Sequence, residues 1–216
     1  MKILHNNDPF FHISLENIFS EDRLKIIFKE INELKNNFEN PESTGSSTYN
    51  FEVLKKNTGM FLVKSENYEN LKTIKFIDNC IKKISITDNW KNTAFRRLFD
   101  SVIWGSELIN CYKKNDYYKP HVDEGIFTLL FFLWERTSNF EGGDLFFPEY
   151  DYLHKCKNNH GILFFSKELH GVTPIISKEK ISTRYSIATF SILNTNPTKN
   201  KKINHNSNKQ TLLSYQ

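Results

Sequence analysis

The sequence predicts an α+β fold that is mainly β, in which helices from the first part of the chain support a β core. Two amphipathic segments, residues 13–39 and about 68–84, come before residue 100. Short apolar runs separated by Gly, Pro and Asn then follow one another to residue 193. This spacing of short runs is typical of a β-sandwich or barrel. We therefore expect the helices to pack on one face of a β-rich core.

The helical prediction depends on apolar residues that recur at steps of three and four, as one face of a helix requires. In the first segment these residues are Leu24, Ile27, Phe28, Ile31 and Leu34. In the second segment they are Leu71, Ile74, Ile77, Ile81 and Ile84. Ser20, followed by two acidic residues, is placed to cap the N-terminus of the first helix. Two short strands, at 51–54 and 59–63, are predicted between the helices.

The later strands of the predicted core differ in their polarity pattern. Residues 126–134 are apolar except for Thr128, which indicates a strand buried on both faces. Residues 184–193 alternate in polarity, so that Arg184 shares a face with Phe190. The final strand is therefore expected to direct a charged side chain toward an apolar interior.

Chain length and aromatic content set the expected domain organisation. With 216 residues, 19 Phe and 9 Tyr, the chain can build a sizeable core. We predict a single domain over residues 1–195, with helical support over about 13–85 and the β core over about 100–193. Residues 196–216 are mostly polar and are predicted to form a flexible tail.

The charge and cysteine patterns argue against several classes of protein. The 29 basic and 25 acidic residues are well mixed and give a formal net charge of +4, so nucleic-acid binding is not indicated. Cys80, Cys111 and Cys156 are far apart and form no Cys-x-x-Cys pair. This argues against a zinc ribbon and against a disulfide framework. We expect reduced thiols in a reducing compartment.

Hydropathy gives the expected location. The N-terminus lacks the long apolar core of a signal peptide, and no stretch approaches the roughly 20 apolar residues of a membrane span. We therefore expect a cytoplasmic protein with no membrane partner. The sequence indicates no particular oligomeric state.

A candidate metal site begins in the stretch "YYKPHVDEG", residues 117–125. His121 and Asp123 are two residues apart, and on a strand such residues point to the same face, where both could reach one ion. His170, in "KELHGVTPI", follows a predicted buried strand and is a candidate third ligand. Two imidazoles and one carboxylate form a facial triad, which leaves coordination positions open and suits a non-haem Fe(II) oxygenase.

Arg184 gives an independent indication of a ligand. A guanidinium directed into an apolar barrel is costly unless an anion meets its planar face of donors. A bound dicarboxylate would supply that anion.

Several segments carry a family resemblance when taken in order over about residues 108–193. They are "INCYKKNDYYKPHVDEG", "FTLLFFLW", "FEGGDLFFPEY", "NNHGILFFSKELHGVTPI" and "RYSIATF". Together they resemble the 2-oxoglutarate- and Fe(II)-dependent dioxygenases, and within them the prolyl-4-hydroxylase-like group. The resemblance implies a double-stranded β-helix core, of the jelly-roll or cupin-like type, with N-terminal supporting helices.

The same resemblance implies roles for individual residues. His121, Asp123 and His170 correspond to the iron ligands. Arg184 corresponds to the partner of the distal carboxylate of 2-oxoglutarate, and Tyr112 to a phenol that donates to that same carboxylate. Fe(II) and 2-oxoglutarate are therefore the implied cofactor and co-substrate, with ascorbate as a further implied cofactor.

The implied reaction is hydroxylation of an unactivated C–H bond with dioxygen and 2-oxoglutarate, which releases succinate and carbon dioxide. The substrate could be a prolyl residue of a peptide or protein, a free amino acid or another small molecule. Arg184 stands where collagen-type prolyl hydroxylases usually carry lysine, so the chain resembles the oxygen-sensing and the bacterial or viral branches more closely. The presence of Asp123 disfavours halogenation, and the absence of a second arginine near Arg184 disfavours nucleic-acid demethylation.

Two alternatives belong to other classes. The first is a non-catalytic β-helix that acts as a binding module, which would have no need of an intact iron site. The second is a cupin-like metalloenzyme that does not use 2-oxoglutarate, which would have no reason to keep a buried arginine at position 184.

Overall fold

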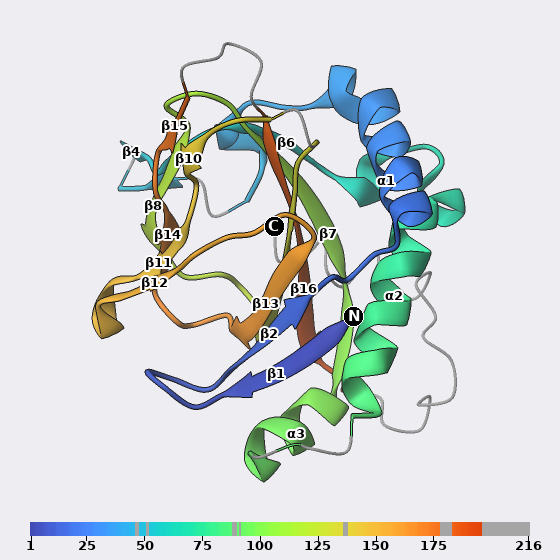
Figure 1. The fold of residues 1–216 in the computed structure, drawn as a ribbon, viewed down its shortest axis with the longest axis vertical. Coiled ribbons are helices and arrows are strands. Elements are labelled where there is room, and N and C mark those ends of the chain that lie inside the picture. The colour runs from blue at the N-terminus through green and yellow to red at the C-terminus, as the bar shows by residue number, and fades with distance from the viewer. Residues whose placement is uncertain are drawn as a thin grey trace.

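The computed structural model describes residues 1–45, 48–50, 52–87, 90, 92–135, 138–177 and 183–195. Two antiparallel sheets face each other, and helices cover the outer side of the larger one (Figure 1). Residues 196–216, which the sequence predicts to be a flexible tail, lie outside the described residues.

The larger sheet has seven strands in the order β1-β2-β13-β9-β16-β7-β6, and all neighbours are antiparallel. The strands are β1 Lys2–Asn6, β2 His12–Glu16, β6 Thr58–Phe61, β7 Val102–Tyr112, β9 Phe127–Leu133, β13 His160–Phe165 and β16 Arg184–Leu193. Strand β9 is almost entirely buried, as its apolar sequence predicted, because apolar layers cover both faces of the sheet.

The smaller sheet has five strands in the order β12-β11-β14-β8-β5. They are β5 Lys55–Lys56, β8 Tyr117–His121, β11 Leu145–Phe147, β12 Tyr152–His154 and β14 His170–Val172. The described residues also form two two-stranded antiparallel sheets, with β3 Thr48–Tyr49 paired to β4 Glu52–Val53 and β10 Glu141–Gly142 paired to β15 Ile175–Ile176. Aromatic and aliphatic side chains from both sheets fill the space between them. This is the double-stranded β-helix that the sequence predicted.

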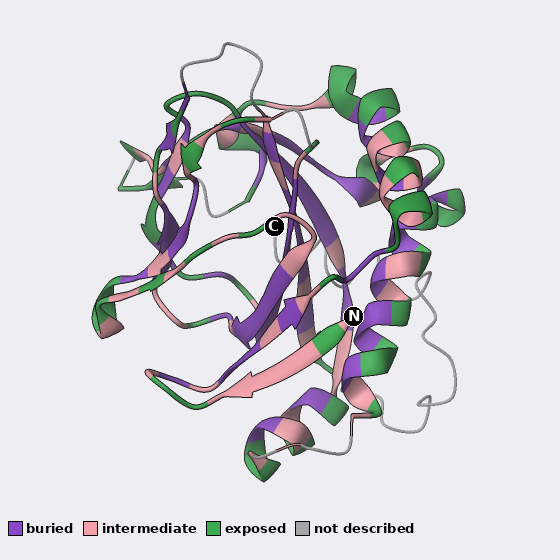
Figure 2. Ribbon diagram, viewed as in Figure 1, coloured by how far each residue is buried: buried purple, intermediate pink, exposed green. Residues whose placement is uncertain are grey.

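Helices α1, Glu21–Leu34, and α2, Lys72–Ser85, pack against the outer face of the larger sheet. Figure 2 shows both helices buried along one side and exposed along the other. Their buried residues include Ile27, Ile31 and Leu34 in α1 and Ile74, Ile77, Ile81 and Ile84 in α2, from the predicted apolar faces. Among the described residues, no helix has the length and apolar character needed to cross a bilayer.

The described part of the chain also contains five short 3-10 turns and a third helix. The turns are η1 Lys35–Asn37, η2 Pro41–Ser43, η3 Leu62–Lys64, η4 Tyr68–Asn70 and η5 Pro148–Tyr150. Helix α3, Thr93–Asp100, was not predicted from the sequence. It begins at Asn92, whose side chain accepts a hydrogen bond from the backbone N–H of Phe95. Such a cap satisfies an N–H that would otherwise have no partner in the first turn.

The prediction of a helix from residue 13 is wrong for its first residues. They belong to strand β2, in which Ile13 and Leu15 are fully buried and pair with both β1 and β13. Apolar residues two apart are the pattern of a strand, and here the sheet edge at β13 supplies the hydrogen-bond partners. Ser20 is the N-cap residue of α1, as predicted, but its side chain makes no capping hydrogen bond.

The strand predictions before residue 65 are correct only in part. The structure describes β4 at Glu52–Val53 and β6 at Thr58–Phe61, and the chain turns into η3 beyond Phe61. Between them lies β5, which belongs to the smaller sheet, whereas β6 belongs to the larger one. Residues 55–61 therefore pass from one sheet to the other at the edge of both.

Candidate active site

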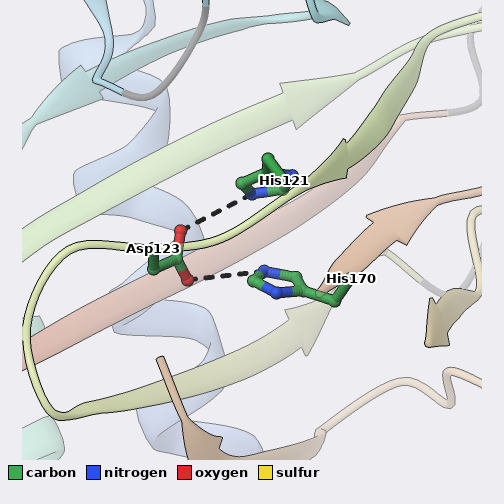
Figure 3. A group of neighbouring side chains, drawn as sticks. All are labelled: His121, Asp123 and His170. Atoms are coloured by element: carbon green, nitrogen blue, oxygen red, sulfur yellow. Dashed lines mark ion pairs between the residues drawn. The ribbon is translucent and has the colours of Figure 1, made fainter. Parts of the chain in front are cut away.

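The three predicted metal ligands lie together between the two sheets. His121 ends β8 and His170 begins β14, and the two residues are cross-strand partners in the smaller sheet. Their imidazole centroids are 4.4 Å apart. Asp123 lies just beyond the end of β8, and its backbone N–H donates to the carbonyl of Ser166. The turn held by this bond directs the carboxylate toward both imidazoles (Figure 3).

The three side chains are close enough to share one ion. Asp123 Oδ1 is 3.5 Å from His121 Nε2, and Asp123 Oδ2 is 3.4 Å from His170 Nε2. One donor atom from each residue lies within 4.8 Å of the other two, and all three residues are buried. Within the described ranges, no other group of three His, Cys, Asp or Glu side chains comes this close.

The hydrogen bonds of the imidazoles fit a metal site. Nδ1 of His121 lies 3.0 Å from the carbonyl oxygen of Lys119, and Nδ1 of His170 lies 2.8 Å from that of Glu168. A carbonyl only accepts, so each Nδ1 is placed to donate to it, and each Nε2 is the ring nitrogen that faces the carboxylate of Asp123. Two nitrogen ligands and one carboxylate are the donor set of a non-haem Fe(II) site with open positions.

The charge state of the triad is also suited to a cation. Burial would raise the pKa of Asp123, but the imidazoles of His170 and His121 outweigh it and hold the pKa well below its usual range. Burial and the neighbouring His170 lower the pKa of His121. At neutral pH the carboxylate is therefore ionised and the His121 imidazole is neutral, which are the forms that bind metal.

Aromatic rings hold the two imidazoles in place. The Tyr118 ring stacks on His121 with centroids 3.5 Å apart and an angle of 13° between the planes. Phe164 meets His170 edge to face at 4.9 Å. Tyr118 and Phe164 belong to the apolar cluster between the sheets, so the same packing that builds the core orients the imidazoles.

The predicted co-substrate residues lie in the same cluster. Arg184 begins β16 and is the cross-strand partner of Tyr112 in β7. Its guanidinium lies 5.0 Å from the centre of the Tyr112 ring and 5.1 Å from that of Phe132, and the residue is only 1% exposed. Tyr112 and Phe132 pack in one cluster with Tyr118. The arginine and the triad therefore border one interior.

The guanidinium of Arg184 has donors without acceptors. Nη2 donates to the sulfur of Cys156 at 3.6 Å, whereas Nε and Nη1 are buried and have no hydrogen-bond partner among the residues that the structure describes. No carboxylate of the described residues forms an ion pair with it. Buried donors on a permanent cation are rarely left unpaired, so their arrangement fits an anionic ligand such as a carboxylate.

Tyr112 is a second buried hydrogen-bonding group beside Arg184. Burial raises the pKa of Tyr112 to about 12, although Arg184 and a hydrogen bond from Asn57 oppose the shift. The phenol therefore keeps its proton. Asn57 also donates to Asn110 Oδ1 at 3.3 Å, and its own Oδ1 is buried with no hydrogen-bond partner in the described ranges.

Asn57 and Cys156 were not predicted as site residues. Asn57 lies between two short strands, and Cys156 is one of three scattered thiols, so neither carries a local signal. They reach Tyr112 and Arg184 only through the pairing of distant strands. A search for polar residues in short strands next to the core could have suggested Asn57, but not its partner.

Comparisons with known proteins agree with this geometry. Residues 108–191 match the family model of the 2OG-Fe(II) oxygenase superfamily, where 2OG denotes 2-oxoglutarate. No curated protein matches the chain by sequence.

Many solved structures match this fold, among them three prolyl hydroxylases. A viral collagen prolyl hydroxylase from Paramecium bursaria Chlorella virus-1, in complex with 2OG, is 13% identical with a TM-score of 0.57, and the match covers 85% of this chain and 97% of that one. A Trichoplax adhaerens prolyl hydroxylase, in complex with a hypoxia inducible factor peptide, is 17% identical with a TM-score of 0.60, covering 84% and 83%. A Pseudomonas putida prolyl-4-hydroxylase is 13% identical with a TM-score of 0.60, covering 85% and 92%. Residues 108–191 are therefore similar to the 2OG-Fe(II) oxygenase superfamily, and the chain has the fold of these three prolyl hydroxylases.

Proposed function

We propose that the chain hydroxylates an unactivated C–H bond, with His121, Asp123 and His170 as the ligands of Fe(II). The balanced reaction consumes the substrate, dioxygen and 2-oxoglutarate and yields the hydroxylated substrate, succinate and carbon dioxide. The observation that carries this proposal is the buried guanidinium of Arg184, two of whose nitrogens have no partner in the described part of the chain, in the same interior as a His-Asp-His cluster. A metal-binding barrel that did not use a dicarboxylate would leave this charge without a partner.

Each residue has a distinct part in binding. The imidazoles present Nε2 and Asp123 presents a carboxylate oxygen, and bound iron supplies the redox chemistry that couples oxidation of 2-oxoglutarate to hydroxylation. Arg184 and Tyr112 hold the far carboxylate of 2-oxoglutarate through charge-assisted and phenolic hydrogen bonds. This fixes the length of the co-substrate that fits between the arginine and the triad.

The aromatic surroundings keep water away from the reacting atoms. Phe132 and Phe164 are fully buried, and Tyr118 is nearly so. The ring of Phe132 lies beside Arg184, that of Phe164 beside His170 and that of Tyr118 beside His121. Exclusion of water strengthens the electrostatic contacts within the site and protects a reactive oxidant from side reactions.

A prolyl residue of a peptide or protein is the substrate that we propose first. Solved structures with this fold include a collagen prolyl hydroxylase and a prolyl hydroxylase in complex with a peptide. A free amino acid or another small carboxylate is the second candidate. Lys55 favours a small carboxylate substrate, because its buried ammonium has no carboxylate partner among the described residues. The ammonium lies 5.0 Å from the Tyr118 ring and donates to the carbonyl of Thr44.

We also propose ascorbate as an accessory reductant and the cytoplasm as the location. Free thiols at Cys80, Cys111 and Cys156 support a reducing compartment.

The proposal is tested in two stages. Fe(II) and 2-oxoglutarate are first added to the protein without oxygen, and the weak visible charge-transfer band of the chelate is sought. Candidate proline-containing peptides and free amino acids are then incubated aerobically and analysed by mass spectrometry for a gain of one oxygen. Iron binding without the band would contradict the use of 2-oxoglutarate and favour the cupin-like alternative. A band without oxygenated product or succinate would favour the binding module.

A further inference from the structure

A buried hydroxyl group binds the carboxylate of Asp123, and a second buried hydroxyl group binds the first. Thr128 Oγ1 donates to Asp123 Oδ2 at 2.7 Å, and Ser166 Oγ lies 2.9 Å from Thr128 Oγ1. Both Thr128 and Ser166 are fully buried. Thr128 is the polar exception in the otherwise apolar run 126–134.

The direction of these hydrogen bonds follows from the charge of the carboxylate. Asp123 is ionised, so it can only accept, and the single hydroxyl hydrogen of Thr128 is committed to it. Ser166 must therefore donate to Thr128, which gives the order Ser166 to Thr128 to Asp123. Each donor in such a chain polarises the next and strengthens its bond.

The hydroxyl pair connects the two sheets at the site. His121 and His170 belong to the smaller sheet, whereas Thr128 lies on β9 and Ser166 directly follows β13 in the larger sheet. Asp123 lies on the segment that passes between the sheets. Without a contact to the larger sheet, its carboxylate would be free to rotate away from the imidazoles.

The backbone of Asp123 is held to the same region. Its N–H donates to the carbonyl of Ser166 at 2.9 Å, and its own carbonyl accepts from Nζ of Lys167 at 3.0 Å. The main chain and the side chain of Asp123 are therefore both fixed, and only the side-chain contact acts on the carboxylate directly.

We propose that Thr128 and Ser166 are positioning residues for the metal, an inference that rests on the proposed Fe(II) site. Thr128 donates to Oδ2, which also faces His170, and this bond favours Oδ1, which faces His121, as the oxygen that binds the ion. The carboxylate then binds through one oxygen, which keeps the remaining coordination positions open for 2-oxoglutarate and dioxygen. Partners of this kind orient metal ligands and tune metal affinity.

The test measures metal binding without turnover. Thr128→Val removes the hydroxyl and keeps the shape, Thr128→Ser keeps the hydroxyl, and Ser166→Ala removes only the outer donor. Thr189→Val is the matched control, because Thr189 is a fully buried threonine of the same sheet whose hydroxyl bonds the carbonyl of Gly105. Each protein is titrated with Mn²⁺ in the absence of 2-oxoglutarate, and the bound ion is examined by electron paramagnetic resonance.

We expect Thr128→Val to weaken Mn²⁺ binding by about tenfold to hundredfold, the usual effect of removing such a partner. Thr128→Ser and Thr189→Val should bind Mn²⁺ with wild-type affinity and give the wild-type resonance. The resonance of bound Mn²⁺ should change in Thr128→Val. Ser166→Ala should weaken binding by a smaller factor. Wild-type affinity and resonance in Thr128→Val would overturn the inference.

The failure of the metal site itself has a different signature. If wild type and His121→Ala bind Mn²⁺ equally, or if neither binds it, the proposed Fe(II) site is wrong and the inference falls with it. If circular dichroism shows that Thr128→Val does not fold, Mn²⁺ binding by Ser166→Ala tests the inference instead. Weakened binding in Ser166→Ala supports the hydroxyl chain, and unchanged binding overturns it.

Discussion

Arg184 and Tyr112 are cross-strand partners in β16 and β7, and the guanidinium lies 5.0 Å from the centre of the phenol ring. This pairing places the permanent positive charge of Arg184, on the inner face of β16, beside the phenol of Tyr112. Burial raises the pKa of that phenol, so it keeps its proton. Both groups can therefore act on one carboxylate, and the consequences can be measured separately from metal binding.

Arg184→Met should raise the half-saturating concentration of 2-oxoglutarate, because it removes one partner of a buried charge pair. Such losses amount to about 2–5 kcal/mol. Arg184→Lys should give an intermediate effect, since it keeps the charge but loses the planar arrangement of donors. The measurement is succinate formation across a co-substrate titration. Mn²⁺ binding should be unchanged, because Arg184 is not a proposed ligand. An unchanged half-saturating concentration in Arg184→Met would show that another group holds the carboxylate.

A divalent ion should stabilise the folded protein through the triad. At an ion concentration of 100 times Kd, the stabilisation is about 2.7 kcal/mol, which is measurable as an increase in Tm. His170→Ala should lose most of this increase, and chelation with EDTA should reverse it in the wild type.

His160→Ala is the matched control for that measurement. Nδ1 of His160 also lies next to a backbone carbonyl, at 2.8 Å from Asn158, but the residue is not part of the triad. It should keep the full ion-dependent increase in Tm. Equal increases in His170→Ala and His160→Ala would mean that the ion binds elsewhere.

Gly143→Ala should disturb the position of Arg184. Gly143 has φ +67°, and an added Cβ would lie 2.4 Å from Ile175 Cδ1 and 3.0 Å from Arg184 Cδ. We expect a loss of stability of about 1 kcal/mol or more and a higher half-saturating concentration of 2-oxoglutarate.

Gly45→Ala is the control that separates the loss of stability in Gly143→Ala from its effect on the use of 2-oxoglutarate. Gly45 also has a positive φ, +56°, and the nearest atom to its added Cβ belongs to Phe61 at 3.2 Å. This variant should lose stability but retain wild-type use of 2-oxoglutarate. Urea unfolding and a co-substrate titration on both variants provide the comparison, and equal half-saturation in the two would argue against the contact with Arg184.

Lys55 should make stability depend on pH. Burial lowers its pKa from 10.5 to about 8, and Asp123 opposes the shift. Between these values the unfolded chain holds a proton that the folded chain has released, so the free energy of unfolding rises with pH from about 8 to 10.5. Lys55→Met should abolish this rise, whose size is at most about 3 kcal/mol.

Urea unfolding of wild type and Lys55→Met at pH 7 and pH 9.5 tests that expectation. The stability of the wild type relative to the variant should be greater at the higher pH. Lys56→Met, which alters the exposed neighbouring lysine, should keep the wild-type dependence. A constant difference between wild type and Lys55→Met at both values would show that the ammonium is not desolvated.

The sequence by itself determined which residue types the candidate site contains. A histidine and an aspartate two residues apart, a second histidine after a buried strand, and an arginine at the start of an alternating strand can be read directly, because ligand type and polarity are properties of individual residues. Periodicity likewise determined helices α1 and α2 and the buried strand β9, since each pattern is complete within one segment.

Only the tertiary structure decided the contacts that make the site specific. Strand β2 was predicted as helix because its hydrogen-bond partners lie on β1 and β13, and β13 is distant in sequence. Asn57 reaches Tyr112, Cys156 reaches Arg184, and Thr128 reaches Asp123 through the pairing and packing of separate strands. Register between distant strands depends on how two sheets pack their shared apolar interior, and no local pattern records that choice.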